Sequence, residues 1–126
     1  MAVTDQSFGK SARLLNARDY KAVFDAAEIK ASNQHILLLA KPNSLSHSRL
    51  GLVIAKKNVR LAVQRNRIKR IVRETFRVQR AQPSIDIVVL ARHGLDKLES
   101  PELHARFGKL LKELNGKARR KLTNPD

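Results

Sequence analysis

The sequence predicts an α+β fold in which one sheet of about four strands, mostly antiparallel, carries helices packed on it. Apolar residues follow helical and extended spacings in the order helix, strands, helix, strand, helix, which favours that class. The 126 residues, 42% hydrophobic and 29% charged, suffice for one domain with its own core. The chain contains no cysteine, so neither disulfides nor thiolate metal sites are expected.

The first helix is expected from Asn16 through about Ala27. Asn16 is a favourable N-cap residue, and Asp19 places a negative charge in the first turn. Tyr20 and Phe24, four residues apart, share one face of this helix. On the residues alone, these two rings either join the core or form a platform for stacking nucleobases.

Four segments have the pattern of strands. Residues 34–40 and 50–55 are apolar runs separated by a short polar region, and we expect them to pair antiparallel. Residues 28–31 are a shorter and weaker candidate. Residues 85–91 are the clearest strand, because they are β-branched and nearly all apolar.

Between the last two strands, a helix is expected from about Ala62 to Gln79. Its apolar stripe has helical spacing and consists of Ile68, Ile71, Val72, Thr75 and Phe76. The opposite face gathers Asn66, Lys69, Arg70, Arg73 and Arg77. A strand–helix–strand connection through this helix would cross over right-handed by the general rule.

The last helix is expected to begin at Ser100, and Gly116 is expected to end its regular part. The basic residues that follow Gly116 either continue the helix or fray. Its apolar residues at helical spacing are Leu103, Phe107, Leu110, Leu111 and Leu114. The predicted organisation is therefore a flexible N-terminal lead over 1–12, one domain over 13–116, and a basic C-terminal tail over 117–126.

The charge of the chain is concentrated in one segment. The formal net charge is +15, and residues 56–80 hold ten Lys or Arg against one acid, which is +9 of that total. A solvated helix face normally mixes signs to gain ion pairs, whereas this one does not, so we expect a polyanion as partner. Glu74 is expected to pair with Arg70 or Arg67. Lys56 and Lys57, just before the helix, either approach phosphate or form a simple charged loop.

The remaining patterns exclude several classes of protein. The four histidines have no metal-ligand spacing, and no catalytic motif can be assembled, so we expect no catalytic residue and no metal site. No apolar run reaches the length of a membrane span, and the N-terminus lacks a signal peptide pattern, which predicts a cytoplasmic protein without membrane contact. A general RNA-binding or ribosomal protein stays open, as does a DNA-binding protein, although no helix-turn-helix pattern is present.

One long stretch resembles a known family. Residues 51–57 (GLVIAKK), Ala62-Val63 and residues 65–74 (RNRIKRIVRE) closely resemble the protein subunit of bacterial ribonuclease P, whose signature is an Arg-Asn-Arg helix after a Lys-Lys strand end. The likeness extends to residues 19–24 and to the strand over 85–92. The resemblance implies an α/β sandwich with a left-handed crossover through the basic helix, against the right-handed default.

The resemblance also implies a function. In this family a catalytic RNA subunit uses Mg²⁺ to remove the 5′ leader from precursor tRNA, while the protein binds that RNA and the leader. No cofactor is expected on the protein itself, and no obligate protein partner. The resemblance matches Arg65, Asn66 and Arg73 to motif positions that face RNA. With the charge pattern, the predicted contacts to the RNA subunit or to phosphate are Lys56, Lys57, Arg60, Arg65, Asn66, Arg67, Lys69, Arg70, Arg73 and Arg77. The implied leader cleft consists of Tyr20, Phe24, His35 and Leu38.

Overall fold

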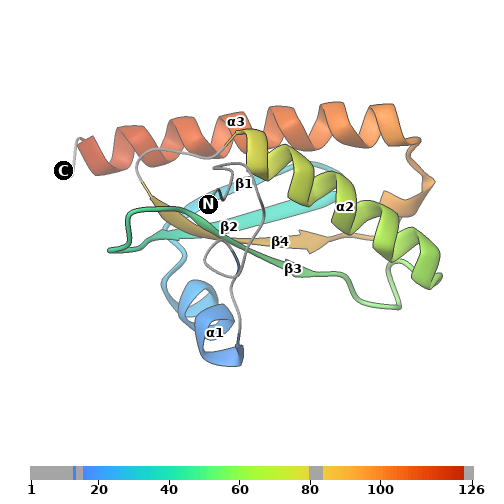
Figure 1. Cartoon of the computed structure of the whole chain (residues 1–126), viewed down its shortest axis with the longest axis horizontal. Helices are drawn as coiled ribbons and strands as arrows, with labels where there is room; N and C mark the ends of the chain where they lie inside the picture. Colours follow the sequence, from blue (N-terminus) through green and yellow to red (C-terminus); the bar gives the residue numbers. More distant parts are fainter. Residues whose placement is uncertain (1–12, 14–15, 80–83, 124–126) are drawn as a thin grey trace, which may run out of the picture.

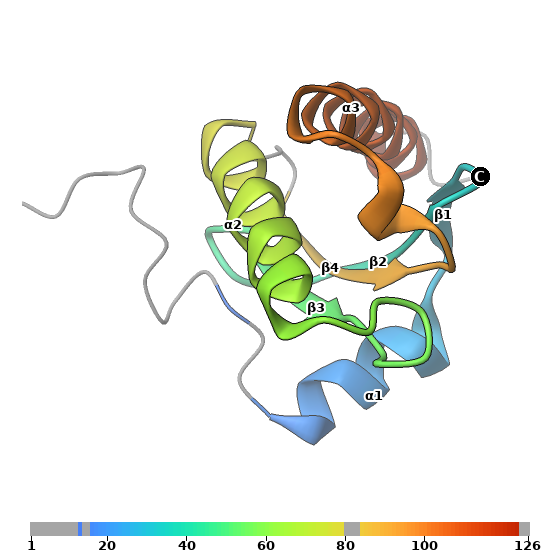
Figure 2. The ribbon, with the colours of Figure 1, turned by 90° about the vertical axis from the view of Figure 1, so that its right-hand side faces the viewer.

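The computed structural model describes residues 13, 16–79 and 84–123, which form three layers (Figure 1). A four-stranded sheet is the middle layer. Helix α1 (Ala17–Ala26) covers one face, while α2 (Ala62–Val78) and α3 (Ser100–Thr123) cover the other, as Figure 2 also shows. The predicted α+β fold is confirmed. The predicted lead over 1–12 lies outside the described residues.

The order of the strands corrects one prediction. The strands are β1 (Ile29–Ser32), β2 (Ile36–Pro42), β3 (Arg49–Val53) and β4 (Ile85–Ala91). Their order is β1-β2-β4-β3, with β1–β2 and β2–β4 antiparallel and β3–β4 parallel. β2 and β3 were expected to pair with each other, which is wrong because β4 lies between them. β4 is buried along almost its whole length, because strands flank both of its edges and helices cover both faces of the sheet.

The parallel pairing of β3 and β4 requires a crossover, and α2 provides it. The helix packs its apolar stripe into the main core, as predicted, through Ile68, Ile71, Val72, Thr75 and Phe76. The left-handed sense that the family resemblance implies for this crossover stays a prediction.

Alternate strand residues face different layers. The set facing α2 and α3 forms the main core, which includes Ile36, Leu38, Ala40, Ile85, Ile87 and Val89. The set facing α1 forms a smaller cluster, in which Val23 of α1 and Val88 of β4 are fully buried. Leu39, Val53 and Leu90 pack against that pair and stay partly exposed. One short helix therefore covers only part of its face of the sheet.

Helix α3 continues past Gly116 to Thr123, so the basic residues after Gly116 continue the helix, which is one of the two alternatives that the sequence left open. A glycine inside a helix costs about 1 kcal/mol relative to alanine, and contacts beyond it offset that cost. Ala118 is fully buried in the main core, and the ammonium of Lys117 donates to the carbonyl of Lys30 in β1 at 2.8 Å. Lys117 and Ala118 therefore hold the part of α3 after Gly116 against the rest of the protein.

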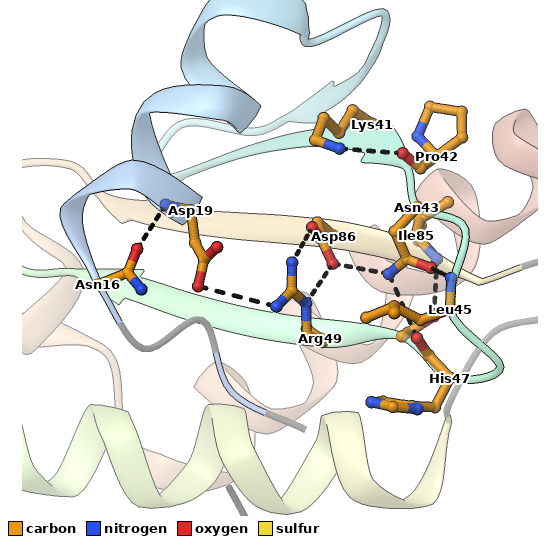
Figure 3. Close-up of polar contacts among 11 residues, drawn as sticks. Asn16, Asp19, Lys41, Pro42, Asn43, Leu45, His47, Arg49, Ile85 and Asp86 are labelled. Atoms are coloured by element: carbon orange, nitrogen blue, oxygen red, sulfur yellow. Dashed lines mark hydrogen bonds and ion pairs between the residues drawn. The ribbon is translucent and has the colours of Figure 1, made fainter. Parts of the chain in front are cut away.

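A buried ion pair fixes the position of α1 on the sheet (Figure 3). Arg49 of β3 donates to both carboxylate oxygens of Asp86 in β4, from Nε at 2.9 Å and from Nη2 at 2.7 Å. Asn43 donates to the same carboxylate at 2.7 Å, and Arg49 also lies 3.7 Å from Asp19 of α1. Asp19 in turn donates its backbone N–H to the side chain of Asn16, which confirms the predicted cap.

Two opposing effects set the pKa of Asp86. The side chain is 1% exposed, and burial raises its pKa. Hydrogen bonds from Arg49 and Asn43 and the charge of Arg49 outweigh that effect, so the pKa lies below its ordinary value. Asp86 is consequently a charged group that holds β3, β4 and the 43–48 turn together.

Candidate RNA-binding surfaces

The first candidate surface is formed by the polar side of α2 and the loop before it. We call it the basic surface, and it consists of Lys56, Lys57, Arg60, Asn66, Lys69, Arg70, Arg73 and Arg77, all exposed or partly exposed. Glu74 lies 3.9 Å from Arg77 and 3.4 Å from His104, so the expected pairing with Arg70 or Arg67 is wrong. The reason is the approach of α3, which brings His104 beside α2. Arg70 and Arg73, two cations of this surface on α2, are exposed to solvent.

Two predicted phosphate-binding arginines are bonded within the protein. Arg65 donates from Nη1 to the carbonyls of Val59 and Arg60, at 3.0 and 2.9 Å. Arg67 donates to the side chains of Gln64 and Ser100. It also donates to the backbone carbonyls of Asp96 and Leu98, which lie in and just after the short 3-10 helix η2 (Leu95–Lys97). Both therefore shape the site: Arg65 holds the loop before α2, and Arg67 joins α2 to the start of α3.

Replacing Arg67 with Ala is expected to lower the free energy of unfolding by about 1–3 kcal/mol, because carbonyls that accept from a charged donor lose it. Urea unfolding followed by circular dichroism measures the change. The matched control is Arg70→Ala on the exposed side of the same helix, where we expect a change within about 0.5 kcal/mol. Equal stability of the two variants would contradict the structural role of Arg67.

The loop between β3 and α2 is anchored near its middle by two consecutive residues. Val59 is fully buried, and the side chain of Asn58 donates to the carbonyl of Ala91 at 3.0 Å. Lys56 and Lys57 precede these two anchors, Arg60 follows them, and all three are exposed. Figure 2 shows the loop passing from α2 toward the side of the sheet that carries α1. The loop thus extends the basic surface toward the second candidate surface.

The second candidate surface begins at Tyr20 of α1. Its hydroxyl accepts a hydrogen bond from the backbone N–H of Leu52, at 3.2 Å, on the outer edge of β3. Its ring lies directly on Gly51, where an added Cβ would come within 2.7 Å of ring atoms. This is the close backbone approach that the isolated glycine predicts in a strand. Tyr20 is therefore partly committed to the fold.

Phe24, one turn further along α1, is 44% exposed. It lies on the same side of the sheet as the partly exposed residues Leu37, Val53 and Leu90. We call Tyr20, Phe24, Leu37, Val53 and Leu90 the α1-side surface. Exposed aromatic and aliphatic groups are suited to stacking bases of a single strand.

Leu38 has to be removed from the predicted leader cleft, and Leu37 and Leu90 are added to it. Leu38 is fully buried in the main core, on the sheet face opposite α1, so it cannot line the α1 side. The neighbours Leu37 and Leu39 face α1 instead, because successive side chains of a strand alternate. The signal in the sequence is this alternation, which assigns Leu37 to the α1 side once Leu38 is known to be buried. The register of the sheet then adds Leu90, which pairs with Leu37 and faces the same side.

His35 lies just before β2, against the turn at Gly94. An added Cβ on Gly94 would lie 3.4 Å from the His35 ring, and Gly94 has the positive φ of 92° that favours glycine. The carbonyl of His35 accepts from the backbone N–H of Arg92 at 2.9 Å. Arg92 is exposed beside His35 and is a cation that the sequence patterns did not single out.

Comparison with known proteins identifies the family. The family model described as ribonuclease P matches residues 8–115. The chain belongs to the ribonuclease P protein family. Ribonuclease P protein components of Pseudomonas paraeruginosa and Pseudomonas putida strain GB-1 are 56% and 51% identical to it over 113 residues, which is 89% of this chain and 84% of each relative.

Solved ribonuclease P proteins share the fold. The Thermotoga maritima protein, solved with 1-(4-fluorophenyl)-2-thiourea, superposes with a TM-score of 0.70 at 32% identity, covering 82% of this chain and 97% of that one. A Staphylococcus aureus ribonuclease P protein mutant with defective mRNA degradation activity gives 0.75 at 27% identity, covering 82% and 88%. Family membership makes the chain the protein component of a tRNA-processing endoribonuclease whose catalyst is RNA.

Across residues 13, 16–79 and 84–123, none of the helices has the length and apolarity that crossing a membrane would require.

Proposed function

We propose that this ribonuclease P protein binds the catalytic RNA through the basic surface and the single-stranded leader of precursor tRNA through the α1-side surface. The observation that carries the proposal is the connection of the two surfaces by one rigid loop, 54–61, with Lys56 and Lys57 exposed on it. One protein can thereby contact the RNA subunit and the substrate at the same time.

Each surface contributes a different physical effect. Cations of the basic surface offset the repulsion between two polyanions and so reduce the Mg²⁺ concentration that the catalytic RNA requires. The metal is proposed to serve the RNA and not to bind this chain. The α1-side surface adds affinity for precursor over product, since the product has lost the leader. Bacterial tRNA is transcribed in the cytoplasm, so we expect the protein to act there.

Cleavage of a precursor tRNA at low Mg²⁺ by the cognate catalytic RNA, with and without this protein, tests the proposal. We expect a large gain in rate with the correct 5′ end, and no cleavage by the protein alone. Tight RNA binding without any gain would contradict the proposal and favour a general RNA-binding protein.

Phe24→Ala is expected to weaken binding of precursor tRNA to the holoenzyme by about 1–3 kcal/mol, the contribution of one stacked base. Binding of mature tRNA should stay unchanged, because it has no leader. Phe24 is a sharper test than Tyr20, whose ring and hydroxyl also support β3. The matched control is Leu45→Ala, which removes a side chain of nearly equal exposure, 43% against 44%, from the 43–48 turn. Equal losses on precursor and mature tRNA would show that Phe24 does not contact the leader.

A further inference from the structure

A groove lies between the second half of α2 and the middle of α3, on the sheet face opposite α1. Its volume is about 540 Å³, within the range of roughly 300–1,000 Å³ that is typical of ligand sites. Its lining includes the small residues Ala105 and Gly108 and the side chain of Val78, which is 60% exposed. Gly108 lies close to α2, since an added Cβ would be 3.4 Å from the amide of Gln79. The groove is therefore a shallow, partly apolar depression.

The charges around the groove are unequal. Arg77, Lys109 and Lys112 line it, against the single carboxylate of Glu74, which already lies beside His104 and Arg77. The ammonium groups of Lys109 and Lys112 have no ion pair within the described part of the chain. Elsewhere on the same helix, cations with carboxylate partners are Arg106, Lys117 and Lys121. The two groove lysines are thus available to an anion from outside.

The groove is continuous with the basic surface, because Arg77 belongs to both. It is also separated by the sheet from the α1-side surface, where the leader is proposed to bind. A strand of RNA that crosses Arg70 and Arg73 of α2 would reach the groove next. An exposed apolar side chain above small residues, with cations at the rim, suits an unpaired base with its flanking phosphates.

We propose that the α2–α3 groove binds an unpaired segment of the catalytic RNA, with phosphates at Lys109 and Lys112 and a base against Val78 and Ala105. The proposal rests on the proposed function, because it assigns a second contact to the same RNA partner. It extends the RNA contact from α2 to α3, and it commits to the catalytic RNA and not to the tRNA.

The first test removes the two unpaired cations together, as Lys109→Ala with Lys112→Ala. We expect weaker binding to the catalytic RNA and a decrease of roughly 2 in the slope of log K against log salt, about one for each phosphate contact. The control removes two cations from the end of the same helix, Arg120→Ala with Lys121→Ala, and should leave the slope unchanged. Equal slopes for the groove variant and the unmodified protein would overturn the proposal.

The second test locates the contact directly. The chain has no cysteine, so Ala105→Cys provides one thiol for an azidophenacyl photocrosslinker inside the assembled holoenzyme. We expect crosslinks to a discrete site in the catalytic RNA, and none from the same probe at Lys121→Cys. Crosslinks only to precursor tRNA, or none at all, would overturn the assignment.

The two proposals can fail separately. If the unmodified protein stimulates cleavage while the groove variant keeps its full salt slope, only the groove assignment is wrong. If the unmodified protein gives no stimulation at low Mg²⁺, the proposed function itself fails.

Discussion

Replacing Asp86 with Ala is expected to lower the free energy of unfolding by about 3–5 kcal/mol, the usual cost of removing one partner of a buried ion pair. Arg49 would lose both of its charge-assisted hydrogen bonds, and Asn43 would lose its acceptor. Because Arg49 keeps 22% of its side chain exposed, water can solvate it in part, which favours the lower end of that range. Urea unfolding at neutral pH measures the effect.

The pH dependence of the same interaction gives a second readout. The pKa of Asp86 is lower in the folded protein than in the unfolded chain, so the unfolded chain binds more protons at acid pH. The stabilisation is complete above the unfolded pKa of about 3.9 and is lost as the pH falls through the lower folded value. We therefore expect the difference in stability between the unmodified protein and Asp86→Ala to shrink as the pH falls below about 4.

A double variant separates the charge from the packing. Arg49→Met with Asp86→Leu removes both charges and keeps apolar volume, so it should recover much of the lost stability. If the double variant is as unstable as Asp86→Ala alone, the loss comes from packing or from Asn43, and the ion pair is not its cause.

Removing three cations of the basic surface, as Lys69→Ala, Arg70→Ala and Arg73→Ala together, is expected to produce the largest loss of RNA affinity. The slope of log K against log salt for the catalytic RNA should decrease by roughly 3, about one for each phosphate contact. Arg65 is left in place because it holds the carbonyls of Val59 and Arg60, and its removal would mix a structural effect with loss of charge.

A triple variant on α3, with Arg106, Arg120 and Lys121 replaced by Ala, is the control of equal charge. Filter binding over a salt series should show an unchanged slope for this variant, because its three residues lie outside both the basic surface and the α2–α3 groove. An equal decrease for both variants would mean that net charge, and not the basic surface, governs RNA binding.

Much of the secondary structure follows from local patterns. The cap at Asn16 and the stripe from Ile68 to Phe76 each predicted a helix that the structure contains, because capping and helical spacing act over a few residues. Whether α3 continues past Gly116 did not follow, since Ala118 is buried in the core and Lys117 bonds to β1, 87 residues away in sequence.

The RNA-binding surface, too, was predicted from the sequence only in part. The Arg-Asn-Arg segment and its net charge indicated an RNA-binding helix, because charge and helical face are properties of the sequence itself. Which arginines are available to RNA was not predictable. Arg67 is bonded to Asp96 and Leu98, and these partners approach only when α3 packs beside α2.

The sequence by itself determined the fold class, the basic helix and the family, since periodicity, charge and motif need no distant contact. Tertiary structure decided that β4 separates β2 from β3, that Leu38 is buried while Leu37 faces α1, and that Tyr20 lies on Gly51. Each depends on which residues distant in sequence pack together, and that choice is made by burying apolar surface across the whole domain.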